Sequence, residues 1–161
     1  MIPVFLILFI LFLIIFNYYQ NKSAQRQENA ERAFWERERR ANLTRKQDIS
    51  QLAYLTLSRD LIPGTLHTQA EESLLELCDT RMIDLSSYTN TDLKLQYGAA
   101  NLQTLTDCEE RYMRMIRQIP VYAQELIDAG NTEAARTLLV FGQNSGANAQ
   151  IYTVLLDALE G

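Results

Sequence analysis

The chain has 161 residues, of which 47% are hydrophobic and only 6 are Gly and 3 Pro, so the composition excludes a disordered protein and allows one ordinary folded domain. Its net charge of −5 is divided unevenly: residues 20–48 carry 8 Lys/Arg and 5 Asp/Glu, a balance of +3, whereas residues 49–161 carry 7 Lys/Arg and 15 Asp/Glu, a balance of −8. Because binding to phosphates needs a basic face, a body this acidic argues against a nucleic-acid partner.

The first 16 residues, MIPVFLILFILFLIIF, form the first predicted element and contain no polar side chain. As a helix they would extend about 24 Å, at about 1.5 Å per residue, and Asn17, Tyr18 and Tyr19 would lengthen the span toward the ~30 Å of a hydrocarbon core. Tyrosine suits the membrane interface because its ring is apolar and its hydroxyl is polar. We therefore expect a transmembrane anchor over residues 1–19, with Tyr18, Tyr19 and Lys22 at the membrane interface.

Two other interpretations of this segment are a secretory signal peptide and a buried core helix. A signal peptide needs a basic region before the apolar run and a small-residue cleavage site after it, and FNYYQNK offers no such site. A core helix of a small soluble domain keeps a polar face, whereas Leu, Ile and Phe cover every face of this helix. The transmembrane anchor therefore remains the favoured interpretation.

The charges that flank the apolar run predict its orientation. Lys22, Arg26 and Arg32 follow the run, whereas no basic side chain precedes it. By the positive-inside rule, in which acidic residues count for little, the C-terminal body then lies in the cytoplasm. The sequence thus predicts a single-pass protein of the cell membrane with a cytoplasmic C-terminal domain.

Residues 20–47 are rich in Gln, Glu, Arg and Ala and contain no Gly or Pro, a composition that predicts a charged juxtamembrane helix. In ERAFWERERR, charges of both signs are interleaved, which is typical of a solvated helix. A second interpretation is that Phe34 and Trp35 dock on the body or on a partner while the neighbouring arginines contact anionic lipid headgroups. The two interpretations are compatible, and Phe34 and Trp35 are candidate partner-binding residues.

Residues 48–161 are expected to form one helical soluble domain. Its first part has the weakest pattern: LAYLTL shows a slight two-residue alternation, which allows a short strand or an extended arm, and Ile62-Pro63-Gly64 indicates a turn. Thr68-Gln-Ala-Glu71 then matches a capping box, which predicts the start of a helix. One face of that helix is expected to be apolar and consists of Ala70, Leu74, Leu75, Cys78 and Met82.

A shorter helix is expected to begin at Asn90 and to end at Gly98. A second capping box, Thr106-Asp-Cys-Glu109, predicts the start of the most amphipathic helix of the chain. Pro120 is expected to kink or end this helix, with a further helical stretch after it. The apolar face covers about a third of the circumference. It consists of Leu105, Cys108, Tyr112, Met115, Ile116 and Ile119.

Three arginines, Arg111, Arg114 and Arg117, stand opposite that apolar face. Such a stripe is typical of a solvated helix face whose cations pair with nearby acids such as Glu110. The alternative is a clamp for an acidic peptide or a carboxylate, which guanidinium groups bind through paired hydrogen bonds. The three arginines are therefore candidate partner-binding residues as well.

After this helix come a turn at Gly130-Asn131-Thr132, a helix with apolar residues on two faces, a break at Asn144-Ser-Gly146 and a last helix from Ile151 to Leu159. Taken together, residues 119–159 resemble a tetratricopeptide repeat followed by the first helix of the next repeat. In that pattern, small residues let two helices cross closely and a glycine forms the turn between them. The matching residues are Ala123, Gly130, Ala135, Leu139, Gly142 and Leu156. The departures are Ala147, where a proline is usual, and Asp157, where a small residue is usual.

The sequence lacks the usual catalytic, metal and cofactor motifs. His67 is the only histidine, and C-x-x-C, G-x-x-x-x-G-K-[ST], G-x-G-x-x-G and H-E-x-x-H are all missing. Cys78 and Cys108 fall on apolar helix faces, where cysteine is usually a small buried hydrophobic residue. We therefore expect no catalytic, cofactor-binding or metal-binding residue, no cofactor and no small-molecule substrate, and hence a protein that is not an enzyme.

The predicted fold is mostly α: a transmembrane helix, a polar juxtamembrane helix, and a small helical body similar to tetratricopeptide repeats. The resemblance implies a membrane-anchored protein-interaction adaptor or scaffold, whose partners are the lipid bilayer and another protein. The alternative is a small accessory subunit of a membrane complex that contacts its partner through the transmembrane helix. The order of the anchor, FWERERRAN and NTDLKLQYGAANL is also similar to that of short single-pass bacterial membrane proteins, a resemblance that implies no activity.

Overall fold

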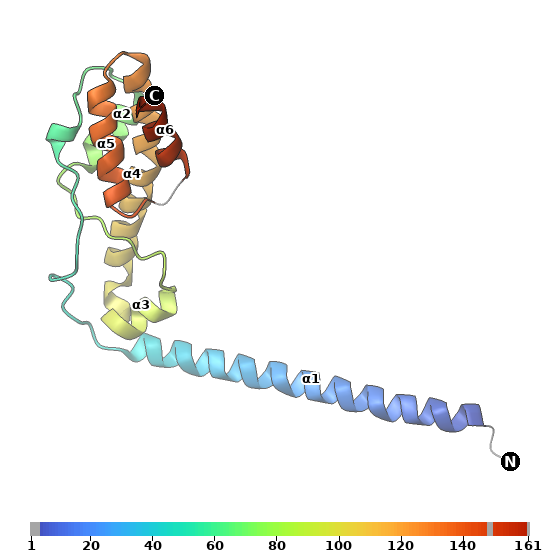
Figure 1. Cartoon of the computed structure of the whole chain (residues 1–161). Helices are drawn as coiled ribbons and strands as arrows, with labels where there is room; N and C mark the ends of the chain where they lie inside the picture. Colours follow the sequence, from blue (N-terminus) through green and yellow to red (C-terminus); the bar gives the residue numbers. More distant parts are fainter. Residues whose placement is uncertain (1–3, 148–149, 161) are drawn as a thin grey trace.

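The computed structural model describes residues 4–147 and 150–160, and helices dominate them (Figure 1). The α-helices in this part of the chain are α1 (Val4–Leu43), α2 (Gln69–Leu77), α3 (Asn90–Tyr97), α4 (Leu102–Asp128), α5 (Thr132–Asn144) and α6 (Gln150–Glu160). Two short 3-10 helices, η1 (Arg59–Leu61) and η2 (Ala99–Asn101), lie between them. The described residues form isolated β-bridges but no strand, so the prediction of a mostly α fold is confirmed for them.

The apolar run and the charged stretch after it form one helix, α1, of 40 residues. The chain can stay helical over this length because it has no Gly or Pro from Val4 to Leu43. The apolar side chains from Leu6 to Phe16 are between 45% and 60% exposed, so the body covers none of them. Among the described residues, this is the one helix that is long and apolar enough to cross a membrane, by length and composition.

The body is built around α4, which packs against α2, α5 and α6 (Figure 1). The apolar face predicted for α4 is the centre of the core, and only Ile116 is half-buried rather than buried. The buried members of this face are Leu105, Cys108, Tyr112, Met115 and Ile119. Further along the same helix, Tyr122, Ala123 and Leu126 are fully buried as well. The periodicity of the sequence therefore identified the central helix correctly.

The predicted start of α4 is wrong. The helix begins at Leu102, so Thr106 and Glu109 lie inside it and do not form an N-terminal capping box. Asn101 occupies the cap position, but its side-chain amide donates hydrogen bonds to two backbone carbonyl oxygens outside the helix. A Thr-x-x-Glu pattern in a helix interior has no orphan amides to satisfy, which is why the pattern misled here.

Pro120 is predicted to kink or end the helix, and it does not end it, because α4 continues through it to Asp128. A proline inside a helix removes one backbone hydrogen bond and crowds the preceding turn, which usually costs about 3 kcal/mol. Pro120 is buried between Ile119 and Tyr122, both of which are fully covered. We infer that the packing of this part of α4 in the core offsets the local cost.

α4 and α5 form a helical hairpin whose turn lies at Gly130, at a φ of 80° that favours glycine. Ala135 and Leu139 of α5 are fully buried. Gly142 lies so close to α6 that a Cβ there would be 2.4 Å from Cε1 of Tyr152. The small residues of the C-terminal segment therefore do lie at helix contacts, while membership of the repeat family stays a prediction.

Residues 44–67 run beside the helical body as an extended arm, one of the two options that the sequence left open (Figure 1). Leu55 and Met82 form an antiparallel bridge in which each amide donates to the other's carbonyl oxygen, at 2.8 and 2.9 Å. Leu57, which is fully buried, forms a parallel bridge with Cys78. The arm is thus fixed to the loop that follows α2.

The first turn of α2 contains a buried acid, Glu71. The Thr68 side chain accepts a hydrogen bond from the Glu71 amide at 3.3 Å, as the predicted capping box requires. The Glu71 carboxylate, however, accepts from the amides of Thr65, Leu66 and His67 and from the hydroxyl of Tyr122. Burial alone would raise the pKa of Glu71, but these hydrogen bonds outweigh burial and hold the pKa below its ordinary value.

Candidate functional site

The C-terminal end of α1 is attached to α3 by ion pairs, at a contact that we call the joint (Figure 1). Arg37 Nη2 lies 2.5 Å from Asp92 Oδ1. Glu38 accepts hydrogen bonds from the Thr91 hydroxyl and from Lys94 Nζ, the latter at 3.0 Å. The Thr91 hydroxyl and then Lys94 lower the pKa of Glu38, which keeps that carboxylate charged. The charged stretch of α1 therefore forms its ion pairs with the body near the C-terminal end of the helix.

The backbone completes the joint. The amide of Gln47 donates to the carbonyl oxygen of Tyr97 at 3.0 Å, and Asn101 Nδ2 donates to the carbonyl oxygens of both residues at 2.7 Å. Gly98, at a φ of 87°, is so close to the preceding chain that a Cβ would lie 2.5 Å from the carbonyl oxygen of Arg45. Only glycine tolerates both the conformation and the contact, so this position defines the path between α1 and the body.

The predicted membrane-interface residues lie together on α1. The rings of Tyr18 and Tyr19 are exposed and meet edge to face, with centroids 5.9 Å apart. Lys22 Nζ lies 5.7 Å from the centroid of the Tyr18 ring. This arrangement groups two exposed amphipathic rings and one cation just after the apolar run, and their place at a membrane interface stays a prediction.

Phe34 and Trp35 do not dock on the body. Their side chains are 54% and 58% exposed, and their rings contact each other edge to face with centroids 5.3 Å apart. The physical reason is geometric, because α1 meets α3 only near its C-terminal end, around Arg37, Glu38 and the fully buried Ala41. The aromatic pair is thus left open for a partner.

Two of the three arginines on α4 are engaged within the body. Arg111 donates to the carbonyl oxygen of Arg81 at 2.8 Å, and Arg114 lies 3.4 Å from a carboxylate oxygen of Glu76 on α2. The contact of Arg114 with Glu76 agrees with the predicted pairing of the stripe with nearby acids, although the acid is Glu76 and not Glu110. Arg117 is exposed. The stripe therefore does not present three unengaged guanidinium groups to a ligand.

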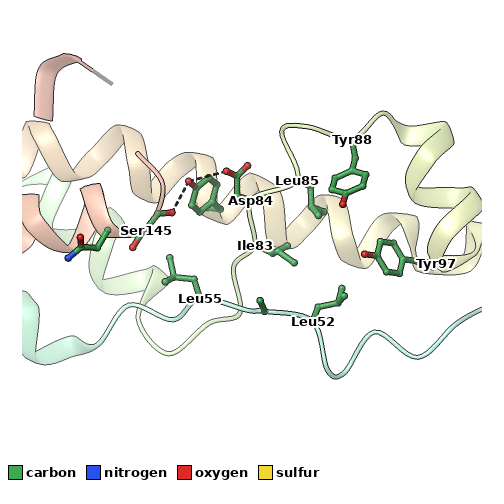
Figure 2. Close-up of a pocket in the computed structure, with 11 residues that line it drawn as sticks. Leu52, Leu55, Ile83, Asp84, Leu85, Tyr88, Tyr97 and Ser145 are labelled. Carbon is green, nitrogen blue, oxygen red and sulfur yellow. Dashed lines mark hydrogen bonds between the residues drawn. The ribbon is translucent and has the colours of Figure 1, made fainter. Parts of the chain in front are cut away.

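A cleft of about 420 Å³, which the sequence analysis missed, opens between the extended arm, the loop after α2, α3, α4 and the end of α5 (Figure 2). One wall is apolar and includes Leu52, Leu55 and Ile83. Figure 2 shows Tyr88 and Tyr97 at one end of the cleft and Asp84 and Ser145 toward the other. The cleft thus combines an apolar wall, an aromatic end and a carboxylate.

The carboxylate end of the cleft is built around Tyr112. Its hydroxyl donates to the carbonyl oxygen of Ser145 at 3.0 Å and lies 3.5 Å from Oδ2 of Asp84 (Figure 2). Because the hydroxyl has one proton and the carbonyl oxygen is nearer, Asp84 Oδ2 keeps most of its capacity to accept. Burial, followed by the charge of Asp84, raises the pKa of Tyr112, which keeps the phenol protonated.

The surroundings of Asp84 are negative. Burial raises the pKa of Glu109, and repulsion from Asp84 and then from Glu110 raises it further. Among the described residues, no ion pair involves any of these three acids. Within the part of the chain that the structure describes, no basic side chain therefore forms an ion pair with the acid at this end of the cleft.

The two cysteines and the single histidine do not line the cleft. Cys108 is buried, Cys78 is half-buried with a pKa raised by burial, and both are free thiols. His67 is exposed, as expected for a surface residue, at a positive φ of 52°. Within residues 4–147 and 150–160, no group of three or more His, Cys, Asp or Glu side chains could hold a metal ion. Comparison with known proteins finds no match among family models, curated proteins or solved structures.

Proposed function

We propose that this protein is a membrane-anchored adaptor, whose apolar N-terminal helix spans the cell membrane and whose helical body binds another protein. The observation that carries the proposal is the unbroken course of α1 from an apolar segment to the joint on α3. An apolar segment that no part of the body covers needs another environment, and a bilayer provides it. The joint then attaches the body directly to the membrane helix.

The length of α1 determines where the body would lie. From Gln20 to Leu43 the helix extends about 36 Å, at about 1.5 Å per residue. The Debye length, over which charges in salt solution interact, is about 8 Å. If α1 lies along the membrane normal, Arg37 and the body are several such lengths from the lipid headgroups. Lys22 and Arg26 are then the cations that meet lipid, and the surfaces of the body are available to proteins.

The basic flank supports a cytoplasmic body. Lys22, Arg26 and Arg32 lie within the distance after the apolar run over which the positive-inside rule applies. The stretch up to residue 48 has a charge balance of +3, with 8 Lys/Arg and 5 Asp/Glu. This orientation also suits two free thiols, since the cytoplasm keeps cysteines reduced.

The C-terminal helices support protein binding. α4, α5 and α6 pack in sequence, as in helical repeats that bind proteins through their exposed faces. The outer side of α6 carries Ile151 and Val154, which are 47% and 52% exposed. In a stacked array such a face would receive the next helix, so the similarity to tetratricopeptide repeats is part of the proposal.

A second candidate is a small accessory subunit of a membrane complex. The exposed pair of Phe34 and Trp35 favours it, because two adjacent exposed rings form an apolar patch, and such patches mark sites that bind proteins or membranes. This pair lies on α1 itself, where a partner beside the anchor could reach it. In that case the specific contact is made by α1, and the body supports the assembly.

The two candidates can be distinguished by exchanging the anchor. Residues 1–19 of the full chain are replaced by an unrelated transmembrane helix, and the chain is crosslinked in membranes and purified with its bound proteins. An adaptor keeps its partner after this exchange, whereas a subunit recognised through its transmembrane helix loses it. In a second arm of the experiment, the chain keeps its own anchor and carries Phe34→Ala together with Trp35→Ala, and its bound proteins are purified in the same way. Loss of the partner in either arm would contradict the adaptor, because it would place the specific contact on α1.

A further inference from the structure

We propose that the cleft beside Asp84 binds the side chain of a lysine or arginine in an extended segment of a partner protein. The inference rests on the proposed adaptor function and names the chemistry that the adaptor would recognise. It starts from three properties of the cleft (Figure 2): an unbalanced negative charge, exposed aromatic rings and an apolar wall.

The charge selects a cation. Asp84 is exposed, and its Oδ2 atom has only the distant hydroxyl of Tyr112 as a neighbouring donor within the described residues. Glu109 adds negative charge close to Asp84, and neither acid has a basic side chain within ion-pair distance among the described residues. A guanidinium or ammonium group would supply the missing donors and relieve the mutual repulsion of the acids.

The aromatic end also suits a cation. Tyr88 is 43% exposed and Tyr97 is half-buried, and Figure 2 shows both side chains at the same end of the cleft. The face of an aromatic ring attracts a cation, and arginine uses this contact most often. Among the described residues, neither phenolic hydroxyl has a hydrogen-bond partner in the chain, so both can also bond to a ligand.

The apolar wall suits the aliphatic part of a long basic side chain. Leu52, Leu55 and Ile83 line the cleft between its carboxylate and aromatic ends. Lysine and arginine bury their methylene groups against such a surface while their charged ends reach polar groups. A volume of about 420 Å³ accommodates one such side chain together with the backbone that carries it. A small inorganic cation would leave the apolar wall unused.

The test uses the full-length protein in phosphatidylcholine nanodiscs and two peptides, acetyl-Gly-Ala-Arg-Ala-Gly-amide and the same peptide with citrulline in place of arginine. Amide chemical shifts in a two-dimensional NMR spectrum follow each titration. We expect the arginine peptide to shift the amides of Ala53, Leu85 and Tyr88. The citrulline peptide keeps the shape of the side chain but lacks its charge, so it should bind at least about tenfold more weakly.

Two variants assign the effect to the cleft. Asp84→Asn keeps the size and one oxygen of the side chain, and it should weaken binding of the arginine peptide at least about fivefold. Asp157→Asn removes the same charge from an exposed position outside the cleft and should leave binding unchanged. Tyr88→Ala removes an exposed ring and should weaken binding without moving amides elsewhere.

Three results would overturn the inference: equal binding of both peptides, equal binding by Asp84→Asn and Asp157→Asn, or shifts confined to another surface. Shifts that depend on protein concentration without peptide would mean that a second copy of the chain occupies the cleft, which also overturns it. The adaptor proposal fails differently, through loss of the membrane partner when the anchor is exchanged. If that partner is retained while the peptide titration fails, the adaptor stands and uses another surface.

Discussion

The joint and the core of the body hold the chain together by different means. The core has many fully buried apolar side chains, among them Leu74, Leu126 and Leu138, whereas the described part of α1 contributes one buried side chain, Ala41, to the joint. The joint relies on one largely exposed ion pair, Arg37–Asp92, one half-buried ion pair, Lys94–Glu38, and backbone hydrogen bonds. Burial stabilises by about 25 cal/mol per Å² of apolar area, and exposed ion pairs contribute little. The joint should therefore open at a lower free energy than the body unfolds.

The largest effect is expected in the core, at the contact between α4 and α5. Ala135 is fully buried, so Ala135→Leu forces extra methyl groups into packed space and should lower the free energy of unfolding by about 1–3 kcal/mol. Gln143→Leu, on the exposed side of the same helix, is the control and should be nearly neutral. Urea unfolding followed by the near-ultraviolet circular dichroism of tyrosine measures both. Equal, negligible effects would mean that Ala135 is not at a close helix crossing.

An effect of similar size that depends on pH is expected at Glu71. Because its pKa in the folded protein is below the ordinary value of 4.5, its carboxylate stabilises the fold above that pH. This stability is lost as the pH falls through the folded-state pKa. Glu71→Gln should therefore lower the free energy of unfolding at pH 7 by about 1–3 kcal/mol, and the deficit should shrink below pH 4.5.

Glu72→Gln is the matched control for Glu71→Gln, because Glu72 is exposed in the same helical turn. Unfolding of the wild type and of both variants is measured at pH 7 and at several values below 4.5. A deficit for Glu71→Gln that stays constant across this range would show that the neutral amide, and not the charge, is responsible. Equal behaviour of the two variants would contradict the role given to the buried carboxylate.

The smallest effect on overall stability is expected at the joint, and it should be local. Gly98→Ala combines a positive φ with a contact of 2.5 Å to the carbonyl oxygen of Arg45, so it should displace the chain that follows α1. Hydrogen exchange at the amide of Gln47, which bonds to Tyr97, should accelerate by roughly tenfold or more. Exchange at Leu138 in the core should not change.

Gly64→Ala separates strain from contact at the joint. Gly64 also has a positive φ, of 68°, but nothing lies within 4 Å of the position that a Cβ would take. Gly64→Ala should therefore leave the rate of hydrogen exchange at the Gln47 amide the same as in the wild type. If Gly98→Ala accelerates exchange at Leu138 as much as at Gln47, the joint and the core form one cooperative unit, and the contrast between them is lost.

Sequence periodicity predicted the parts of the fold that depend on local pattern. The apolar face of α4, the turn at Gly130 and the end of α3 at Gly98 all follow from residues within one or two helical turns. The capping box at Thr106 failed because the same four residues also occur inside helices. A four-residue pattern cannot distinguish the N-terminus of a helix from its interior, because that difference depends on the residues that precede the pattern.

The joint and the cleft could not be predicted, because distant segments form them. Arg37 and Asp92 are 55 residues apart in the chain, and nothing in the charge pattern of ERAFWERERR singles out its last residues for docking. The cleft draws on the extended arm, a loop and three helices, so Asp84 and Tyr112 meet only in the folded body. The one signal available was the loop sequence around Tyr88, an exposed aromatic residue between polar ones.

The central claim, a cytoplasmic body attached to a membrane helix, is tested most directly by thiol labelling in intact cells. Cys78→Ala and Cys108→Ala remove the natural thiols, and Asp157→Cys places one on the exposed side of α6. The variant should remain in the membrane fraction after alkaline extraction and should react with a membrane-impermeant maleimide only after lysis. Labelling of Asp157→Cys before lysis, or release of the chain by alkaline extraction, would contradict the account.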